Sequence, residues 1–123
     1  MAAVIKSVTF DCADALVLAR FWAAALGTDV DEDATAGRAY VEAPGWGGPN
    51  MWFIRVPDPP RAAKNRMHFD LRSPSTLRAE VDRLTALGAV VAERLDGHTV
   101  LTDPEGNVFC VELGPDDPVR EAG

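Results

Sequence analysis

Polar and apolar side chains alternate through residues 66–71, near the middle of the chain. Successive side chains of an extended strand point to opposite faces, so this alternation predicts a strand with His68 and Asp70 on one face. The apolar residues share the other face: Met67, Phe69 and Leu71. One face of this strand is therefore expected to carry chemistry, and the other to pack in the core.

The first half of the chain predicts one helix among short strands. Residues 15–26 carry apolar side chains at helical spacing, Asp14 suits the N-cap, and Gly27 can adopt the left-handed conformation that ends a helix. Alternating and β-branched runs predict the strands: residues 7–11, 28–33, 38–43 and 50–56. The Gly- and Pro-rich residues 44–49 predict a loop with Trp46 at its tip.

The second half predicts the same order of elements. Ser73 suits the cap of a helix that has Pro74 in its first turn and ends at Gly88. The apolar stripe of this helix consists of Leu77, Val81 and Leu84. The predicted strands are residues 66–71, 90–93, 98–102 and 108–113. Residues 103–106 suit a type I turn, and the polar tail 115–123 is expected to fray.

Two short sequences recur in the two halves. Thr9-Phe10-Asp11 matches His68-Phe69-Asp70, 59 residues later, and Ala25-Leu26-Gly27 matches Ala86-Leu87-Gly88, 61 residues later. Each half also gives a strand, a helix and three further strands. The chain is therefore predicted to be a duplication of one βαβββ module.

This duplication predicts an α+β fold for a single domain over residues 1–123. The first module is expected at residues 5–57 and the second at 64–114. Neither module alone can bury its helix-facing residues and still shield its polar side. We therefore expect a curled, mixed sheet of eight strands, with the helices outside and a groove inside.

Composition narrows the classes of function. The 123 residues, 47% of them apolar and 25% charged, suit one hydrophobic core. The net charge of -7 argues against nucleic-acid binding, which needs clustered Lys and Arg. No apolar run reaches the roughly 20 residues of a membrane span, and no secretory leader pattern opens the sequence, so we expect a cytoplasmic protein without a membrane partner. The spacing of Cys12 and Cys110 matches no metal knuckle or redox pair, and both are expected to be reduced.

Four motifs, in order across the two halves, resemble the vicinal oxygen chelate superfamily, which includes glyoxalase I, bleomycin-resistance proteins and extradiol dioxygenases. They are the helix 14–27 with Phe21-Trp22 and Leu26-Gly27, the strand 66–71, the helix end Ala86-Leu87-Gly88, and Asp103-Pro104-Glu105-Gly106-Asn107. The resemblance spans residues 5–113 and is closest to small actinobacterial-type proteins called glyoxalase-like. It implies paired βαβββ modules that curl around a cavity, and a homodimer.

The resemblance also implies where a divalent metal would be held, because enzymes of the family use residues from the first and last strands of the modules. His68 falls at the histidine position of the second module, and Cys110 stands at the position of a glutamate. The matching position of the first module holds Ser7 or Thr9. Residues 50–56 contain no carboxylate. We therefore expect no cofactor and no metal in the family's usual position.

Strand parity gathers polar side chains on the expected groove side: Ser7, Thr9, Asp11, His68, Asp70, Cys110 and Glu112. A carboxylate beside an imidazole fixes its tautomer and raises its basicity, so His68 with Asp11 or Asp70 forms the candidate catalytic group. The alternative is that Asp11 and Asp70 hydrogen-bond across the module interface and hold the halves in register.

The other candidates are assigned to ligand binding: Ser7, Thr9, Trp46, Trp52, Cys110 and Glu112. Trp46 is interpreted as a lid over the groove or as a dimer contact. Trp52 and Met51 lie on opposite faces of one strand, so one of them is expected to line the groove. His98, beside Gly97, is interpreted as a solvated turn residue.

These features favour a protein that binds a small organic molecule. One alternative is a metal-dependent lyase, isomerase or dioxygenase with atypical ligands, for which His68, Cys110 and one aspartate are a conceivable zinc set. Another is a drug-sequestering protein of the bleomycin-resistance type, whose acidic groove would suit a cationic drug.

Overall fold

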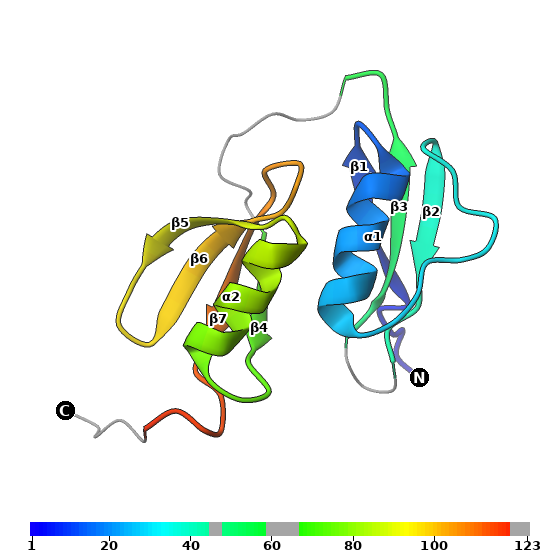
Figure 1. Cartoon of the computed structure of the whole chain (residues 1–123). Coiled ribbons are helices and arrows are strands. Elements are labelled where there is room, and N and C mark those ends of the chain that lie inside the picture. The colour runs from blue at the N-terminus through cyan, green and yellow to red at the C-terminus, as the bar shows by residue number, and fades with distance from the viewer. Residues whose placement is uncertain (45–47, 59–66, 119–123) are drawn as a thin grey trace. The chain divides into compact units, whose positions relative to one another are not determined.

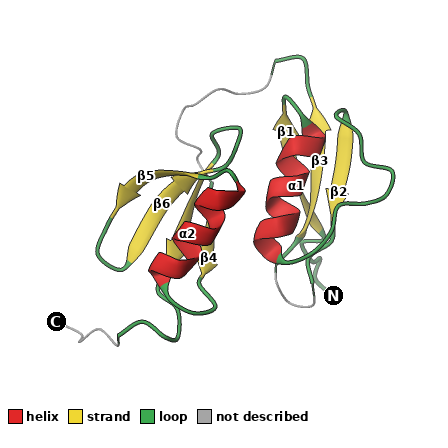
Figure 2. Cartoon of the chain, viewed as in Figure 1, coloured by secondary structure: helices red, strands yellow, loops and turns green. Residues whose placement is uncertain are grey.

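The computed structural model describes residues 1–44, 48–58 and 67–118. The chain divides into two compact units, Met1–Ala63 and Lys64–Gly123, and each contains one helix and one sheet (Figure 1, Figure 2). The α+β class with two βαβββ-like modules is therefore confirmed. The expected eight strands are seven in the described residues, and they form two sheets of three and four strands.

The first unit contains β1 (Ser7–Cys12), α1 (Ala15–Leu26), β2 (Arg38–Val41) and β3 (Asn50–Arg55). The strand order is β1-β3-β2, with β1 parallel and β2 antiparallel to β3. The helix has the predicted bounds, because Asp14 accepts the N–H groups of Leu16 and Val17 and Gly27 adopts φ of 73° at the other end.

The strand predicted at residues 28–33 is wrong. Among the described residues, this stretch pairs with the sheet only through an isolated bridge from Val30 to Val41. The reason lies next to it: the Asp31 carboxylate accepts the Tyr40 N–H at 2.8 Å, and the Asp31 N–H donates to the Tyr40 carbonyl. A side chain thus takes the hydrogen bond that a paired strand would use.

The core of the first unit lies between α1 and one face of its sheet. The predicted apolar stripe of the helix is buried: Leu18, Phe21, Trp22 and Ala25. Phe10 of β1 packs edge-on against Trp22 and against Phe53, with ring centroids 6.2 and 5.3 Å apart. The expected packing of the first strand against the helix is confirmed.

The second unit contains β4 (Phe69–Arg72), α2 (Leu77–Leu87), β5 (Val90–Arg94), β6 (His98–Thr102) and β7 (Val108–Glu112). The order is β4-β7-β6-β5, with β4 parallel to β7 and the other pairs antiparallel. The fully buried apolar side chains of the helix and the sheet form its core: Val81, Leu84, Leu101, Phe109 and Val111. Met67, predicted in the core, precedes β4 and is 83% exposed.

The cap of α2 is Thr76, so the assignment of this role to Ser73 is wrong. Thr76 Oγ1 accepts the Ala79 N–H at 3.1 Å. Ser73 is buried one turn earlier, where its hydroxyl donates to the Thr76 carbonyl and accepts the Ser75 N–H. Its hydrogen bonds are therefore made within the loop, and Pro74 lies outside the helix.

The first part of the tail is anchored, against the prediction that it frays. The Asp117 carboxylate accepts the N–H groups of Leu77 at 2.7 Å and Gly114 at 2.8 Å, and the Asp116 N–H donates to the Ser75 carbonyl. Residues 119–123 lie outside the described residues. Neither α1 nor α2, the helices found in the described ranges, has the length and apolar character needed to cross a bilayer.

Candidate functional site

Each sheet has one face buried with its helix and one open face. In β3, Met51 and Phe53 are buried in the core, and Trp52 between them is half-buried on the opposite face. In β1, Thr9 and Asp11 are exposed on the face opposite Phe10. Of the two candidates on β3, Trp52 is therefore the one on the open face.

The open face of the first unit carries an aromatic platform, which we define as Arg38, Tyr40 and Trp52. The rings of Tyr40 and Trp52 have centroids 4.5 Å apart, and Arg38 Cζ lies 4.7 Å from the Trp52 ring centroid. Thr9 is the neighbour of Trp52 in the β1–β3 register. This surface combines π faces, a cation and a hydroxyl group, which are groups that can orient a small polar molecule.

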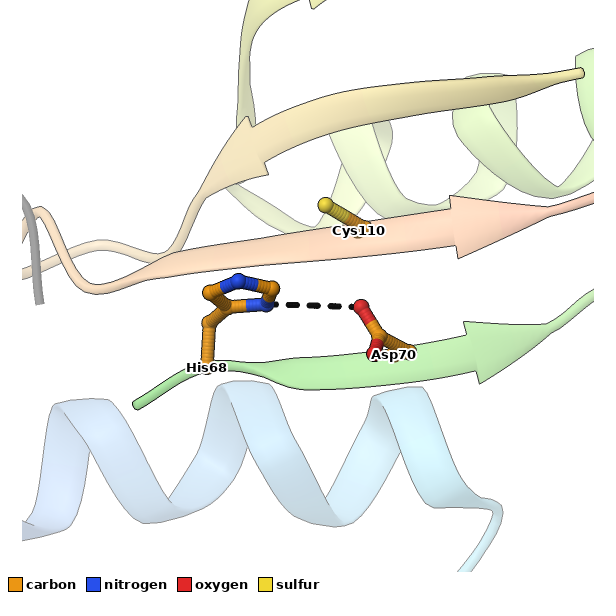
Figure 3. Close-up of side chains that lie close together, drawn as sticks. All are labelled: His68, Asp70 and Cys110. Atoms are coloured by element: carbon orange, nitrogen blue, oxygen red, sulfur yellow. Dashed lines mark ion pairs between the residues drawn. The ribbon is translucent and has the colours of Figure 1, made fainter. Parts of the chain in front are cut away.

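The open face of the second unit carries a cluster of His68, Asp70 and Cys110. The Nδ1 atom of His68 lies 3.3 Å from Oδ1 of Asp70, and one potential ligand atom from each of the three residues lies within 4.8 Å of the others. Figure 3 shows the imidazole turned toward the carboxylate, with the thiol on the neighbouring strand.

Strand register explains why these three residues meet. Asp70 of β4 stands directly opposite Cys110 of β7, because β4 and β7 are parallel neighbours with Phe69 opposite Phe109. His68 is the residue immediately before β4, and its side chain points to the same side of the chain as that of Asp70. The side chains of His68 and Asp70 are 36% and 56% exposed, so the cluster is open to solvent.

Glu112 and His98 lie on the same face of the second sheet. They are direct register partners between β7 and β6, two pairs along from Cys110 and Val100. The interpretation of His98 as a turn residue is wrong, since it begins β6 and is half-buried. Alternation with the buried Thr99 and Leu101 is the sequence signal that could have placed it on the open face.

The predicted site residues divide between the units. Ser7, Thr9, Asp11 and Trp52 belong to the first, and His68, Asp70, Cys110 and Glu112 to the second. Contact of Asp11 with His68 or Asp70 would join the two units and stays a prediction. Trp46 lies outside the described residues.

The repeat provides a test of the metal site that the family resemblance implies. Phe10 opposite Phe53 corresponds to Phe69 opposite Phe109. Counting from these pairs, the equivalents of His68 and Cys110 in the first unit are Thr9 and Ile54. These residues are poor ligands for a divalent ion, so a ligand set drawn equally from both units does not fit this chain.

Comparison with known proteins adds a family and a fold. The model of the glyoxalase-like domain family matches residues 7–112. No curated protein sequence is significantly similar to the chain. A glyoxalase/bleomycin resistance protein/dioxygenase family enzyme from Burkholderia phytofirmans superposes with a TM-score of 0.70 at 16% identity, over 89% of this chain and 97% of that one.

Two further solved structures have the same fold. A glyoxalase/bleomycin resistance protein from Albidiferax ferrireducens has a TM-score of 0.64 at 19% identity, over 86% of this chain and 95% of that one. A mutant of the fosfomycin resistance protein FosX from Listeria monocytogenes, complexed with Mn(II) and 1S,2S-dihydroxypropylphosphonic acid, has a TM-score of 0.65 at 12% identity, over 93% of this chain and 91% of that one. At these identities the likeness is one of fold.

Proposed function

The chain belongs to the glyoxalase-like domain family, and on this premise we propose that it binds a small organic molecule on the open faces of its sheets. The observation that carries the proposal is the aromatic platform. Trp52 and Tyr40 lie half-buried on the face of the sheet opposite the core, with their rings in contact, and Arg38 adds a positive charge above the indole. Aromatic rings that are held rigidly at a surface supply contact area at little cost in conformational entropy.

The ligand that this surface suits has a planar group. A ring or a conjugated carbonyl can stack on the indole, and a polar substituent can reach the hydroxyl of Thr9, which neighbours Trp52 in the sheet. The net charge of -7 attracts a cationic ligand to the protein as a whole, although Arg38 repels a cation at the platform itself, so a basic drug is one class to test. Small carbonyl compounds, phenols and cationic aromatic drugs are therefore the classes to test.

Thermal unfolding of the full chain with each class tests the proposal. A ligand present at 100 times its Kd stabilises the protein by about 2.7 kcal/mol, which raises Tm measurably. Trp52→Leu should abolish the rise, whereas Ile54→Val, on the same face of the same strand, should retain it. The proposal fails if no compound raises Tm, or if Trp52→Leu responds as fully as the natural chain.

A second candidate function is catalysis by proton transfer, and the His68–Asp70 pair favours it. A carboxylate 3.3 Å from an imidazole nitrogen can fix the tautomer and the orientation of the ring. Any compound that raises Tm should then be recovered after incubation and identified by mass spectrometry. Intact compound indicates sequestration, and a changed compound that depends on His68 indicates a lyase, isomerase or dioxygenase.

We also propose a cytoplasmic location and a homodimer, and the resemblance to the vicinal oxygen chelate superfamily supports the homodimer. Sedimentation equilibrium of the full chain measures the assembly directly. A mass of one chain at all concentrations would contradict the dimer and would leave the ligand proposal standing, because the aromatic platform lies within one unit.

A further inference from the structure

We propose that His68, Asp70 and Cys110 bind a divalent transition metal ion, Zn²⁺ in the first place, within the second unit alone. This inference goes beyond small-molecule binding and does not depend on it, because the aromatic platform belongs to the first unit. It replaces the expectation of a metal-free protein with a site of different composition. The ligands are one imidazole, one carboxylate and one thiolate, all from β4, β7 and the residue that precedes β4.

The spacing of the three side chains is close to that of a tetrahedral zinc site. Zinc bonds of 2.0 to 2.3 Å place neighbouring ligand atoms about 3.3 to 3.6 Å apart. His68 Nδ1 and Asp70 Oδ1 already lie 3.3 Å apart. All three ligand atoms lie within 4.8 Å, so closing the widest gap requires a movement of about 1 Å to reach tetrahedral spacing. His68 lies outside the strand, which leaves its backbone free to adjust.

The donor atoms select the class of metal. A thiolate is a soft ligand that suits zinc and similar transition metals, whereas Mg²⁺ and Ca²⁺ prefer sites made of oxygen atoms alone. The exposure of His68 and Asp70 leaves the cluster accessible from solvent. Three protein ligands and an accessible fourth position are the arrangement of a zinc ion that also binds water or a substrate.

An ordinary surface ion pair is the simpler account of His68 and Asp70, since such pairs are common and contribute little to stability. Cys110 distinguishes the two accounts. The parallel register of β4 and β7 holds the thiol opposite Asp70, so the third donor is placed by the backbone of a second strand. An ion pair alone does not need a third donor at this position, and a metal site does.

Calorimetric titration of the chelator-treated full chain with Zn²⁺ tests the proposal. We expect one ion per chain. His68→Ala, Asp70→Asn and Cys110→Ser should each weaken binding by more than about 100-fold, because even residues that only orient a metal ligand cost 10- to 100-fold when replaced. Equal binding by the natural chain and Cys110→Ser would overturn the proposal, as would the absence of stoichiometric binding.

The chain provides its own matched controls, because it contains two histidines and two cysteines. His98→Ala removes the other histidine, and Cys12→Ala removes the other cysteine, which is fully buried in the first unit. Both controls should retain the affinity for Zn²⁺ within about threefold, the scatter expected of substitutions outside the set of ligands. A loss in either control as large as in its partner would contradict the assignment of the ligands.

The reactivity of Cys110 in the natural chain gives a test that does not depend on the folding of a variant. One equivalent of Zn²⁺ should slow the alkylation of Cys110 in the natural chain at least about tenfold, because a metal-bound thiolate is a poorer nucleophile. Peptide mapping separates Cys110 from Cys12. Co²⁺ in place of Zn²⁺ should give a thiolate-to-metal charge-transfer band that Cys110→Ser lacks. Unchanged alkylation of Cys110, or a band that persists in Cys110→Ser, would overturn the proposal.

Discussion

The two units share a framework and differ in what they display on it. In both, a parallel pair of strands joins two phenylalanines, Phe10 with Phe53 and Phe69 with Phe109. One residue further along, Asp11 stands opposite Ile54 in the first unit, and Asp70 stands opposite Cys110 in the second. The core-facing phenylalanines are the same in both units, and so is the aspartate on the open face, whereas the partner of that aspartate differs: Ile54 in one unit and Cys110 in the other.

The difference shows which positions each unit is free to change. A core aromatic residue packs on several neighbours, so its replacement leaves a cavity that costs several kcal/mol, about 3 to 5 for Phe to Ala. A residue on the open face has no such constraint from packing. The first unit displays Trp52 and Tyr40 there, and the second displays a set of metal-ligand types, His68, Asp70 and Cys110.

The strongest test of this equivalence is to build the second cluster into the first unit. Thr9→His with Ile54→Cys, beside the natural Asp11, recreates the three donors at the matching positions. We expect the number of Zn²⁺ ions bound per chain to rise from one to two, as measured by calorimetry. The new site should bind more weakly than the natural one, because Thr9 lies within a strand and cannot adjust as His68 can.

Thr9→His alone is the control for this double variant, and it should leave the stoichiometry at one. A double variant that folds, retains one site and gains no second would show that matching register is insufficient. The two units would then differ in backbone geometry as well as in side chains, because strand register does not describe that geometry.

The next largest expected effect is on stability, and it concerns the close approach of Gly114 to the loop before α2, which the described residues show only in the second unit. A Cβ atom on Gly114 would lie 2.3 Å from the Ser75 carbonyl oxygen and 2.6 Å from that of Ser73. Both are backbone atoms, so the loop before α2 would have to move and lose the hydrogen bonds that begin the helix. Gly114→Ala should therefore lower the free energy of unfolding by about 3 kcal/mol. Urea denaturation followed by circular dichroism measures it.

Gly106→Ala is the matched control, because its φ of 86° is strained for alanine but a Cβ atom there meets nothing within 4 Å. It should cost only about 1 to 2 kcal/mol, the price of the left-handed conformation. All three tryptophans lie in the first unit, so their fluorescence reports whether that unit unfolds together with the second. Equal losses for the two variants would contradict the role given to Gly114.

Local signals in the sequence were enough to predict much of the fold. The bounds of α1 follow from Asp14 and Gly27, which act on their own neighbours. The start of α2 was misplaced because Ser73 and Thr76 are both good caps, and the choice between them depends on Ser73 being buried in the loop. Likewise, no local signal in residues 28–33 predicts that the Asp31 side chain would accept the hydrogen bond from the Tyr40 N–H on β2.

The sequence predicts which face of a strand each candidate residue lies on, but it does not predict which candidates lie close to one another. Alternation alone put His68 with Asp70 on one side of a strand, and Cys110 with Glu112 on one side of another. Which residues stand opposite each other depends on the pairing of β4 with β7, and these strands lie far apart in the sequence. The hydrogen bond from Leu77 to Asp117 spans 40 residues and escaped prediction for the same reason.

The smallest expected effect compares how the two helices begin. Asp14 caps α1 from within its own turn, so Asp14→Ala should cost about 1 kcal/mol. Asp117 accepts N–H groups from the first residue of α2 and from Gly114, so its loss frees donors in two segments at once. Asp117→Ala should therefore cost about 2 kcal/mol. Urea denaturation of the two variants, beside Asp14→Ser and Asp117→Asn, measures the difference. If Asp117→Ala costs no more than Asp14→Ala, the second helix is capped locally like the first, and residues 115–118 contribute nothing to its stability.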